Sequence, residues 1–508
     1  MRQLVPMILV LWLLGPLPTR GATLEELEDQ VKALNEKIEQ MKREQEESKK
    51  AEAEPAEEER RPFFQEALER VKVGGYGSIR FESNTLDEVG NTFTFRRFVL
   101  TTDAAPADRL KTYFELEFER FQVLEVERTT APAEGGLKVQ QAVEATPGSE
   151  IAIEQAWVQY DINDWLKFRG GAVLVPLGRF NIRHDDNLWA LPRRSLVDRG
   201  VPVLPIPAAW PELGMGFTGD LAGGKLGRLN YELYVMNGAT LDAEVEEIIQ
   251  TREGKRDKLE AEVELRPGRG TAQLDTKDGK AVGTRVAWTP LLGQELGASL
   301  YWGRYTPGFL DDEKLLSFGL DGLFSLGPFE LEWEYVNTNF SNVGDVATSI
   351  ARVAREQAVE IEKVDSPDLE VEIEYELAQL AKTKHGYWLE LRRRFWPAFL
   401  KNTFLGKPFE NPQFVAVARW EQAFLDDRVT HVDFTGGTIT AFETEDRWVN
   451  RITAGLAYKP TPLWAFQLAY EYTWTNRGRS LAEVTNFLPA KPNEDKAHAF
   501  LFGVAFGF

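Results

Sequence analysis

From about residue 71 to the end, the chain repeats short segments in which large apolar residues alternate with small or polar ones. Between positions 464 and 474, aromatic residues and leucine occupy every second place, with Ala, Gln, Glu and Thr between them. Successive side chains of a β-strand point to opposite faces, so each segment predicts a strand with one apolar and one polar face. The segment 498–508 places Phe500, Phe502, Phe506 and Phe508 on one face and Ala, Gly and Leu on the other.

Such strands fit two architectures: a soluble sandwich or barrel with its apolar faces inside, and an outer-membrane barrel with its apolar faces toward lipid. Trp448, Tyr458, Trp464 and Trp474 lie at the ends of predicted strands, where interfacial girdles belong. Connections also alternate between short and long, as periplasmic turns and external loops do. The short connections are 104–108, 162–164, 326–328 and 459–463, and the long ones are 126–149, 176–211, 238–280, 339–382 and 423–447. We therefore predict the membrane barrel and keep the soluble fold as the alternative.

The predicted fold class is all-β: a transmembrane antiparallel β-barrel of about 16 strands, with an N-terminal helical segment. Strands in lipid must close on themselves, and an even number returns both ends to the periplasmic side. A barrel of this size leaves a water-filled channel. The predicted strands are 71–82, 92–103, 109–125, 150–161, 165–175, 212–221, 228–237, 281–289, 296–305, 314–325, 329–338, 383–395, 413–422, 448–459, 464–475 and 496–508.

Composition excludes several classes of protein. Mean hydropathy is −0.34 over 508 residues, and no stretch beyond the N-terminus reaches the roughly 18 apolar residues of a spanning helix. The net charge of −21 argues against a nucleic-acid partner, whose phosphates require a basic surface. The chain contains no cysteine, so it has no disulfide, thiolate nucleophile or thiolate metal site.

The N-terminal 70 residues are predicted to form three segments. Residues 1–21 indicate a signal peptide, because an apolar run shorter than a membrane span is followed by small residues; an uncleaved anchor is the alternative. Residues 22–50 predict a coiled-coil helix, since apolar residues recur every three or four positions from Leu24 to Met41. Its β-branched residues favour a two-stranded coil, and a solitary charged helix is the alternative. Residues 51–70 predict a charged linker, and 71–508 the barrel.

Two segments carry a resemblance to a known family. "VPLGRFNIRHDDNLWALPRRSLVDR" (175–199) resembles the third-loop region of porins related to the phosphate-selective porin O/P group. "FLKNTFLGKPFENPQFVAVARWEQ" (399–422) is similar to the same group, as is the coiled-coil leader. The resemblance implies an outer-membrane porin whose third loop folds inward and narrows the pore, so that small hydrophilic solutes, including phosphate or carboxylate anions, diffuse through. It also implies a homotrimer in outer-membrane lipid, and a terminal Phe508 of the kind that the barrel-insertion machinery recognises.

The third loop carries charges of both signs. These charges either pair with the barrel wall and serve structure, or form a mixed-charge constriction that orients anionic solutes. They are Arg179, Arg183, Arg193, Arg194 and Arg199, with Asp185, Asp186 and Asp198. The strand register predicts further charges in the lumen, with acids clustered on two strands and bases on others. They are Lys167, Arg169, Arg285, Arg392, Arg394, Arg419 and Arg451, with Glu115, Glu117, Glu119, Glu330, Glu332 and Glu334.

Two other functions fit parts of the sequence. "RHDD" (183–186) offers residues for a metal or acid–base cluster, but the chain has only four histidines and lacks HExxH or triad spacing. We therefore predict no enzyme, no cofactor and no metal. The second function is a structural tether, in which the coiled coil and linker connect the barrel to the cell wall.

Overall fold

We describe the protein from a computed structural model. It describes residues 70–85, 90–120, 124–133, 136–145, 150–201, 203–249, 258–268, 279–362, 370–375, 380–435, 438–481 and 494–508. The predicted signal peptide, coiled coil and linker lie outside these residues. Within the described residues, no helix has both the length and the apolar character needed to cross a bilayer.

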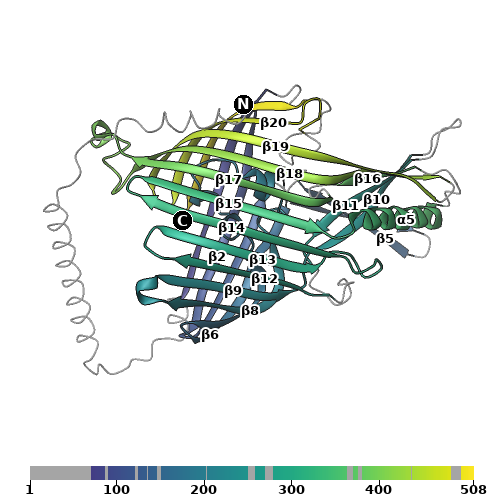
Figure 1. Cartoon of the computed structure of the whole chain (residues 1–508), viewed down its shortest axis with the longest axis horizontal. Helices are drawn as coiled ribbons and strands as arrows, with labels where there is room; N and C mark the ends of the chain where they lie inside the picture. Colours follow the sequence, from purple (N-terminus) through teal and green to yellow (C-terminus); the bar gives the residue numbers. More distant parts are fainter. Residues whose placement is uncertain are drawn as a thin grey trace. The chain divides into compact units, whose positions relative to one another are not determined.

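Sixteen antiparallel strands close into a barrel (Figure 1). Each strand pairs with its neighbour along the barrel, and β21 closes the ring by pairing with β1 from Tyr76 opposite Gly507 to Asn84 opposite Ala499. The strands are β1 Val71–Asn84, β2 Thr92–Ala107, β3 Leu110–Glu119, β6 Glu150–Asn163, β7 Leu166–Leu174, β8 Pro211–Ala222, β9 Arg228–Met236, β12 Ala281–Thr289, β13 Gln294–Arg304, β14 Lys314–Leu326, β15 Phe329–Phe340, β17 Ala381–Phe395, β18 Gln413–Thr435, β19 Thr438–Thr461, β20 Trp464–Thr475 and β21 Lys496–Gly507.

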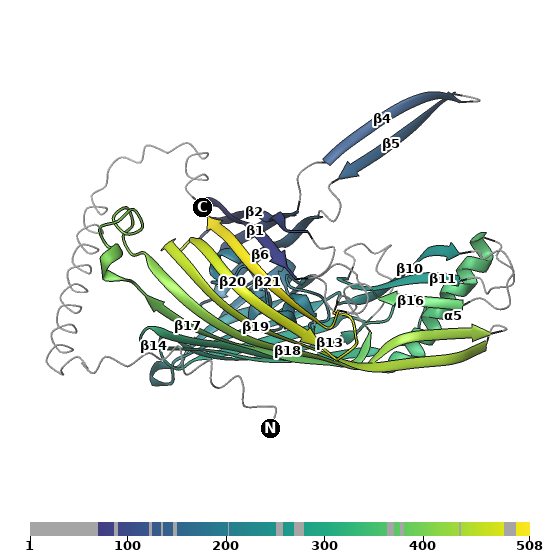
Figure 2. The same ribbon diagram turned by 90° about the horizontal axis from the view of Figure 1, so that it is seen from above.

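The remaining strands and helix α5 belong to the long connections (Figure 2). Strands β4 Leu124–Ala133 and β5 Gly136–Ala145 form a separate two-stranded sheet. Strands β10 Thr240–Ile249, β11 Lys258–Arg266 and β16 Glu370–Tyr375 extend the main sheet beyond the ring: β11 pairs with β16 in parallel, and β16 pairs with β18 at Val371 opposite Val432. Helix α5 Val343–Glu362 packs against β10, β16 and β18. Short helical turns complete the set: η3 Gly224–Leu226 and η4 Ala398–Leu400, and three within residues 175–210.

Alternation in the sequence becomes alternation between the outer and inner faces of the barrel. In the closing strand, Phe500 is 62% exposed to the outside and its neighbour Leu501 only 2%. Large apolar side chains are exposed in the same way on every part of the wall, including Met215, Val235, Leu300, Phe318 and Leu468. A closed ring leaves no unpaired strand edge, and an apolar outer belt is stable only against lipid. The chain is therefore a transmembrane barrel of the outer membrane.

The sixteen predicted barrel strands are confirmed, but several boundaries move. Strand β3 ends at Glu119 instead of residue 125, and the two strands predicted at 413–422 and 448–459 continue outward as β18 and β19. These extensions lie beyond the apolar belt, where no lipid face imposes alternation, so the sequence pattern does not mark them.

The small residues of the closing strand make room for a segment inside the barrel. A Cβ added at Gly503 would lie 2.7 Å from the Cβ of Pro192, and one at Gly455 would lie 2.4 Å from Leu191 Cδ2. Ala190 and Leu191 form a buried apolar cluster with inner-face residues of four strands, including Leu501. The inner face of β21 is therefore a packing surface for the inner loop.

Candidate functional site inside the barrel

The connection between β7 and β8, residues 175–210, folds into the barrel; we call it the inner loop. It contains α4 Arg179–Ile182 and the turns η1 Asp186–Leu188 and η2 Leu196–Gly200. Val175, Leu177, Leu196 and Trp210 are fully buried. Both ends of the loop are joined by a hydrogen bond from the Val175 N–H to the Trp210 carbonyl, 2.9 Å. An apolar stretch of this size inside a barrel gives the loop its own hydrophobic core.

Aromatic side chains join this core to the barrel wall. The Trp210 ring lies 4.7 Å from the Tyr301 ring of β13, and the Trp189 ring meets the Trp388 ring of β17 edge to face at 5.8 Å. Arg392 and Arg419 lie over the faces of Trp189, 5.2 and 5.7 Å from its centroid. Contacts of this kind fix the loop by packing as well as by charge.

Arginines of the inner loop bind acidic residues on opposite sides of the barrel. Arg193 pairs with Glu82 of β1 and, at 2.7 Å, with Glu471 of β20. Arg179 pairs with Glu332 of β15 and with Glu295 of β13. Both guanidinium groups are almost inaccessible to water, at 5% and 2% exposure of the residue. Such buried pairs are costly to break, because removing one partner leaves an uncompensated charge.

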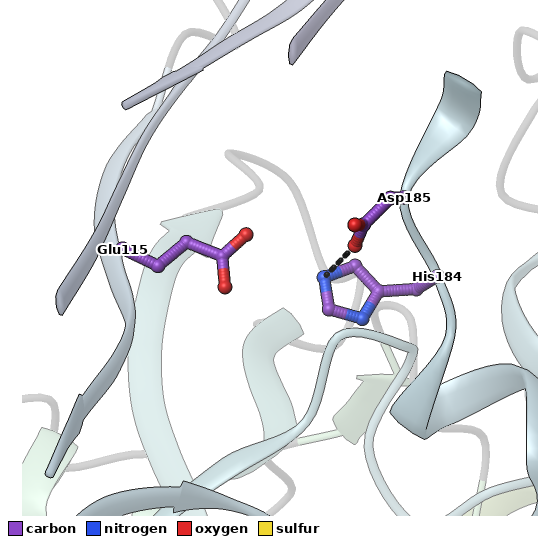
Figure 3. A group of neighbouring side chains, drawn as sticks. All are labelled: Glu115, His184 and Asp185. Atoms are coloured by element: carbon purple, nitrogen blue, oxygen red, sulfur yellow. Dashed lines mark ion pairs between the residues drawn. The ribbon is translucent and has the colours of Figure 1, made fainter. Parts of the chain in front are cut away.

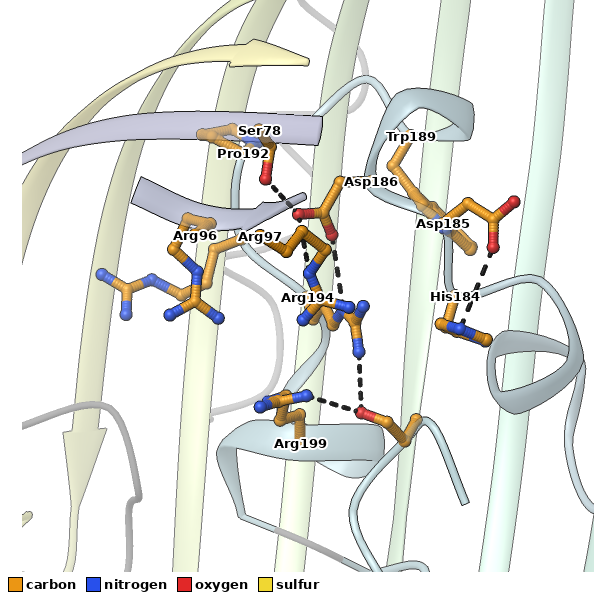
Figure 4. A network of polar contacts seen from close by, with 12 residues as sticks. Ser78, Arg96, Arg97, His184, Asp185, Asp186, Trp189, Pro192, Arg194 and Arg199 are labelled. Atoms are coloured by element: carbon orange, nitrogen blue, oxygen red, sulfur yellow. Dashed lines mark hydrogen bonds and ion pairs between the residues drawn. The ribbon is translucent and has the colours of Figure 1, made fainter. Parts of the chain in front are cut away.

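Asp186 is the centre of a third attachment (Figure 4). It accepts a hydrogen bond from Ser78 and pairs with Arg97 Nε at 3.3 Å and Arg194 Nε at 3.4 Å. Burial alone would raise the pKa of Asp186, but Arg97 and Arg194 hold it far below its usual value. Asp186 therefore stays ionised and serves as a fixed counter-ion.

Arg194 and Arg199 also fold the loop onto itself. They donate to the same backbone carbonyl, that of Ala208, at 2.7 and 3.0 Å, and Arg199 reaches Glu119 of β3 at 2.6 Å. Asp198 is fully buried beside Ser195, whose hydroxyl donates to it. Burial raises the pKa of Asp198 to about 6.

The wall also satisfies backbone groups of the loop. Glu334 of β15 accepts from the N–H groups of Arg179 and Phe180, at 2.6 and 2.8 Å. Glu421 of β18 accepts from the Leu196 N–H at 2.9 Å, and Arg451 of β19 donates to the Arg194 carbonyl at 2.6 Å. A buried loop needs such partners, because unpaired backbone groups are expensive away from water.

One side of the lumen is sealed by these contacts; we call it the packed wall. Its charged residues are at most 9% exposed and pair across neighbouring strands: Arg392 with Glu330 at 2.7 Å, Arg419 with Glu390 at 2.6 Å, and Arg451 with Glu421. The acids and bases therefore neutralise one another along the wall and do not face each other across open water. The packed wall consists of Glu330, Glu332, Glu334, Glu390, Arg392, Arg419, Glu421, Arg451 and Glu471.

The opposite side of the lumen keeps partly exposed polar groups; we call it the open wall. Arg169 donates to Gln159 at 2.7 Å and lies 4.1 Å from the centroid of the Trp157 ring, and Lys167 pairs with Asp220 at 3.0 Å. Arg169, Lys167 and Asp220 are half-buried, whereas Gln159 is buried. The open wall consists of Gln155, Trp157, Lys167, Arg169, Thr218, Asp220, Asn230 and Glu232, from β6 to β9.

The other lumen charges lie on β3, β12 and the end of β17. Arg285 is buried beside Asp321 and, at 3.5 Å, Glu295, while Arg394 is 53% exposed and pairs with Glu330 at 2.9 Å. Glu115, Glu117 and Glu119 all point inward from β3 and are buried. Glu117 pairs with Arg97 at 2.8 Å.

Arg183 and Asp185 are the most accessible charged residues of the inner loop, and Arg199 and Asp186 are less exposed. Arg183 is exposed, and no described residue forms an ion pair with its guanidinium group. The Asp185 side chain is 37% exposed. Between them along the chain, His184 is buried, with Nε2 3.2 Å from Glu154 of β6. Burial would lower the pKa of His184, but Glu154 and Asp185 raise it to about 9.

Sequence reasoning missed the wall residues that hold the loop. Glu82, Glu154, Glu421 and Glu471 were absent from the candidate set, and each binds the inner loop. The apolar, proline-rich run at 201–210 carried a usable signal, because an exposed external loop has no reason to be apolar. Its partners could not be identified, since they lie on strands far away in the sequence.

Comparisons with known proteins add little beyond the fold. No family model matches the chain. An uncharacterized protein of Aquifex aeolicus is 24% identical over 280 residues, which cover 55% of this chain and only 52% of that protein. Among solved structures, the chain is similar to an anion-selective porin from Comamonas acidovorans (TM-score 0.46, 11% identity, 86% of this chain and 99% of that chain covered). It is also similar to OmpF of Salmonella typhi (TM-score 0.44, 10% identity, 86% and 97% covered) and to OmpT of Vibrio cholerae (TM-score 0.42, 9% identity, 86% and 97% covered).

Proposed function

We propose that the protein is an outer-membrane porin through which small hydrophilic solutes diffuse between the inner loop and the open wall. The observation that carries the proposal is the contrast in exposure inside one barrel. The nine charged residues of the packed wall are at most 9% exposed, whereas eight polar or aromatic residues of β6 to β9 are half-buried beside the buried Gln159 and Tyr234. A lumen that was only a packed core would bury both walls equally.

The proposed constriction lies beside Arg183 and Asp185. Arg179, Arg193 and Arg194 are buried in ion pairs and position the loop, and Arg199 and Asp186 are half-buried in theirs. Accessible charges of both signs, Arg183 and Asp185, would face the solute, with Arg169 and Glu232 on the open wall. Such an arrangement orients dipolar or anionic solutes, including phosphate and carboxylates, without excluding either sign. Selectivity for anions is therefore expected to be mild.

We also propose a homotrimer, supported by the resemblance to porins; the coiled-coil pattern at 22–50 supports self-association and by itself favours two strands. Deleting residues 22–61 should weaken assembly and leave the barrel folded. Native mass spectrometry in a mild detergent measures the oligomeric state of the full chain and of the deletion variant. A monomeric full-length protein contradicts this part of the proposal.

The direct test is conductance in planar bilayers. Purified protein should give stable single channels, with a reversal potential in a KCl gradient that indicates mild anion preference. Screening in a wet pore should reduce that preference as salt rises, since the Debye length is about 10 Å at 0.1 M. A folded barrel that conducts no ions contradicts the porin proposal, and the tether hypothesis then remains.

A further inference from the structure

Three side chains from two separate segments converge beside the inner loop (Figure 3). Glu115 extends from β3, and His184 and Asp185 come from the inner loop between α4 and η1. One ligand-type atom of each, two carboxylate oxygens and an imidazole nitrogen, all lie within 4.8 Å of one another. The group therefore brings together nitrogen and oxygen donors that are 69 positions apart along the chain.

The ring of His184 is held in one orientation. Its Nδ1 lies 2.9 Å from the Asn181 carbonyl, so this nitrogen carries a hydrogen and donates. Asn181 is itself fixed, because its amide donates to the Val175 carbonyl and its oxygen accepts from the Trp210 N–H, both at 2.8 Å. Metal-binding histidines are oriented in this way, by a carbonyl that accepts from the nitrogen opposite the metal.

The other ring nitrogen, Nε2, faces only acceptors. Glu154 lies 3.2 Å from it and Asp185 lies 3.9 Å away. A nitrogen lone pair surrounded by carboxylate oxygens is repelled, unless a cation lies between them. That cation is either a proton on Nε2 or a metal ion.

Glu115 supplies the second observation. The residue is 1% exposed, and its Oε1 oxygen has no hydrogen-bond partner among the described residues. Its other oxygen accepts from Gln155 Nε2 at 2.7 Å, which fixes the carboxylate while leaving Oε1 free to bind. A buried carboxylate oxygen without a donor is expensive, and a bound cation would satisfy it.

We propose that Glu115, His184 and Asp185 bind a divalent transition-metal ion of the Zn²⁺ class, with Glu154 as an adjacent carboxylate. Imidazole with carboxylates suits Zn²⁺ and its neighbours, whereas Mg²⁺ and Ca²⁺ prefer oxygen ligands alone. Two carboxylates match the charge of the ion. Zinc ligands lie about 2.0–2.2 Å from the metal, so the three side chains need to approach one another by roughly 1 Å.

The ion would attach the inner loop to β3 at the edge of the proposed passage. Asp185 is the partly exposed member of the set, with a side chain 37% exposed, so an ion can reach the site from the lumen. Metal occupancy would then change both the charge and the mobility of the loop. Binding itself does not depend on whether the barrel conducts.

The test uses the full chain in detergent after treatment with a chelator. Calorimetric titration with ZnCl₂ should show one site per chain, and CoCl₂ should give the visible absorption of a nitrogen- and oxygen-bound ion. His184→Ala and Glu115→Gln should each weaken Zn²⁺ binding by about 10–100-fold. MgCl₂ at the same concentration should not compete.

His385→Ala is the matched control. This histidine on β17 also faces a carboxylate, Asp426 at 3.5 Å, but no third ligand group has been found beside it among the described residues. Its loss should leave Zn²⁺ affinity unchanged. Circular dichroism and heat-modifiable gel mobility confirm that each variant is a folded barrel, and Asp185→Asn replaces His184→Ala if the latter does not fold. A wild-type chain that binds no Zn²⁺, or equal affinity in wild type, Glu115→Gln and Asp185→Asn, overturns the proposal and leaves a protonated imidazole as the cation.

Discussion

The packed wall and the open wall of the lumen contain the same types of residue in different environments. On the packed wall, arginines and glutamates of β15, β17, β18 and β19 pair with each other and with the inner loop, away from water. On the open wall, Arg169 and Lys167 also have polar partners, but they remain half-buried, and no described backbone group of the inner loop binds them. The difference lies in the position of the loop and not in the composition of the strands.

This contrast separates charges that hold structure from charges that solutes can reach. A buried ion pair is strongly destabilised by the loss of one partner, by about 3–5 kcal/mol, while an exposed pair contributes about 0–1 kcal/mol. Replacements on the packed wall should therefore mainly change the free energy of unfolding. Replacements on the open wall should mainly change permeation.

The largest effect is expected from the double replacement Arg193→Glu and Arg194→Glu. It places new carboxylates beside Glu82, Glu471 and Asp186, which now bind these arginines. The loop should detach from β1 and β20, with a loss of stability of about 5 kcal/mol or more. Urea unfolding in lipid vesicles, followed by Trp fluorescence, measures the loss, and conductance should rise. The exposed Arg394→Glu should cost less than about 1 kcal/mol. Unchanged stability and conductance in the double variant would show that the loop is not anchored at these arginines.

A smaller loss is expected from Gly503→Val on the inner face of β21. Its side chain would meet Pro192 and Gln467, with the new Cβ 2.7 and 2.6 Å from their atoms. Overpacking of this kind costs about 1–3 kcal/mol and should push the loop toward the open wall. Gly90→Val is the control, because a Cβ there meets nothing within 4 Å. Unfolding of both variants at the same urea concentration would show that the inner loop does not pack closely on Gly503.

A pH effect is expected from Asp198. Burial raises its pKa to about 6, and an unfolded aspartate has a pKa of about 3.9, so folding takes up a proton between these values. Its stabilising contribution is fully present below about pH 4 and is lost as the pH rises through about 6. The asparagine of Asp198→Asn cannot ionise. As the pH rises from 4 to 7, the free energy of unfolding of the variant should therefore fall by about 1–2 kcal/mol less than that of wild type.

The measurement for Asp198 is the urea midpoint at pH 4, 5, 6 and 7 for wild type and variant. Asp312→Asn serves as the control, since the side chain of Asp312 is 75% exposed. Parallel pH profiles for wild type and Asp198→Asn would contradict an uptake of protons at this buried carboxyl group.

The smallest effect on stability, and the clearest on permeation, is expected from Arg183→Glu. Arg183 is exposed and has no ion-pair partner among the described residues, so the barrel should remain as stable as before. Reversing its charge should move the ratio of cation to anion permeability by about twofold to fivefold at 0.1 M salt. Reversal potentials in a KCl gradient measure the ratio. The control is Lys401→Glu, at an exposed position in the turn after β17, and it should leave the permeability ratio unaltered. An equal change of the ratio in both variants would show that Arg183 does not lie at the constriction.

For each charged side chain, the face of the strand was easier to predict from the sequence than its exposure to water. Period-2 alternation placed Glu330, Arg392 and Arg451 on the inner face, because the side of a strand depends only on whether a position is odd or even. Whether such a residue is solvated depends on what lies opposite. The inner loop covers Arg451 and leaves Arg169 half-buried, and neither strand carries a signal for that difference.

By itself, the sequence determined the sixteen barrel strands, their apolar outer face and the sign of the charges inside, since each of these follows from a local period that neighbouring residues repeat. Only the tertiary structure decided that Arg193 binds Glu82 and Glu471, that Leu191 and Pro192 fill the space above Gly455 and Gly503, and that His184 meets Glu115. The physical reason is that these partners lie on strands that closure of the ring brings together, and the loop can occupy only the part of the lumen where they pair with it.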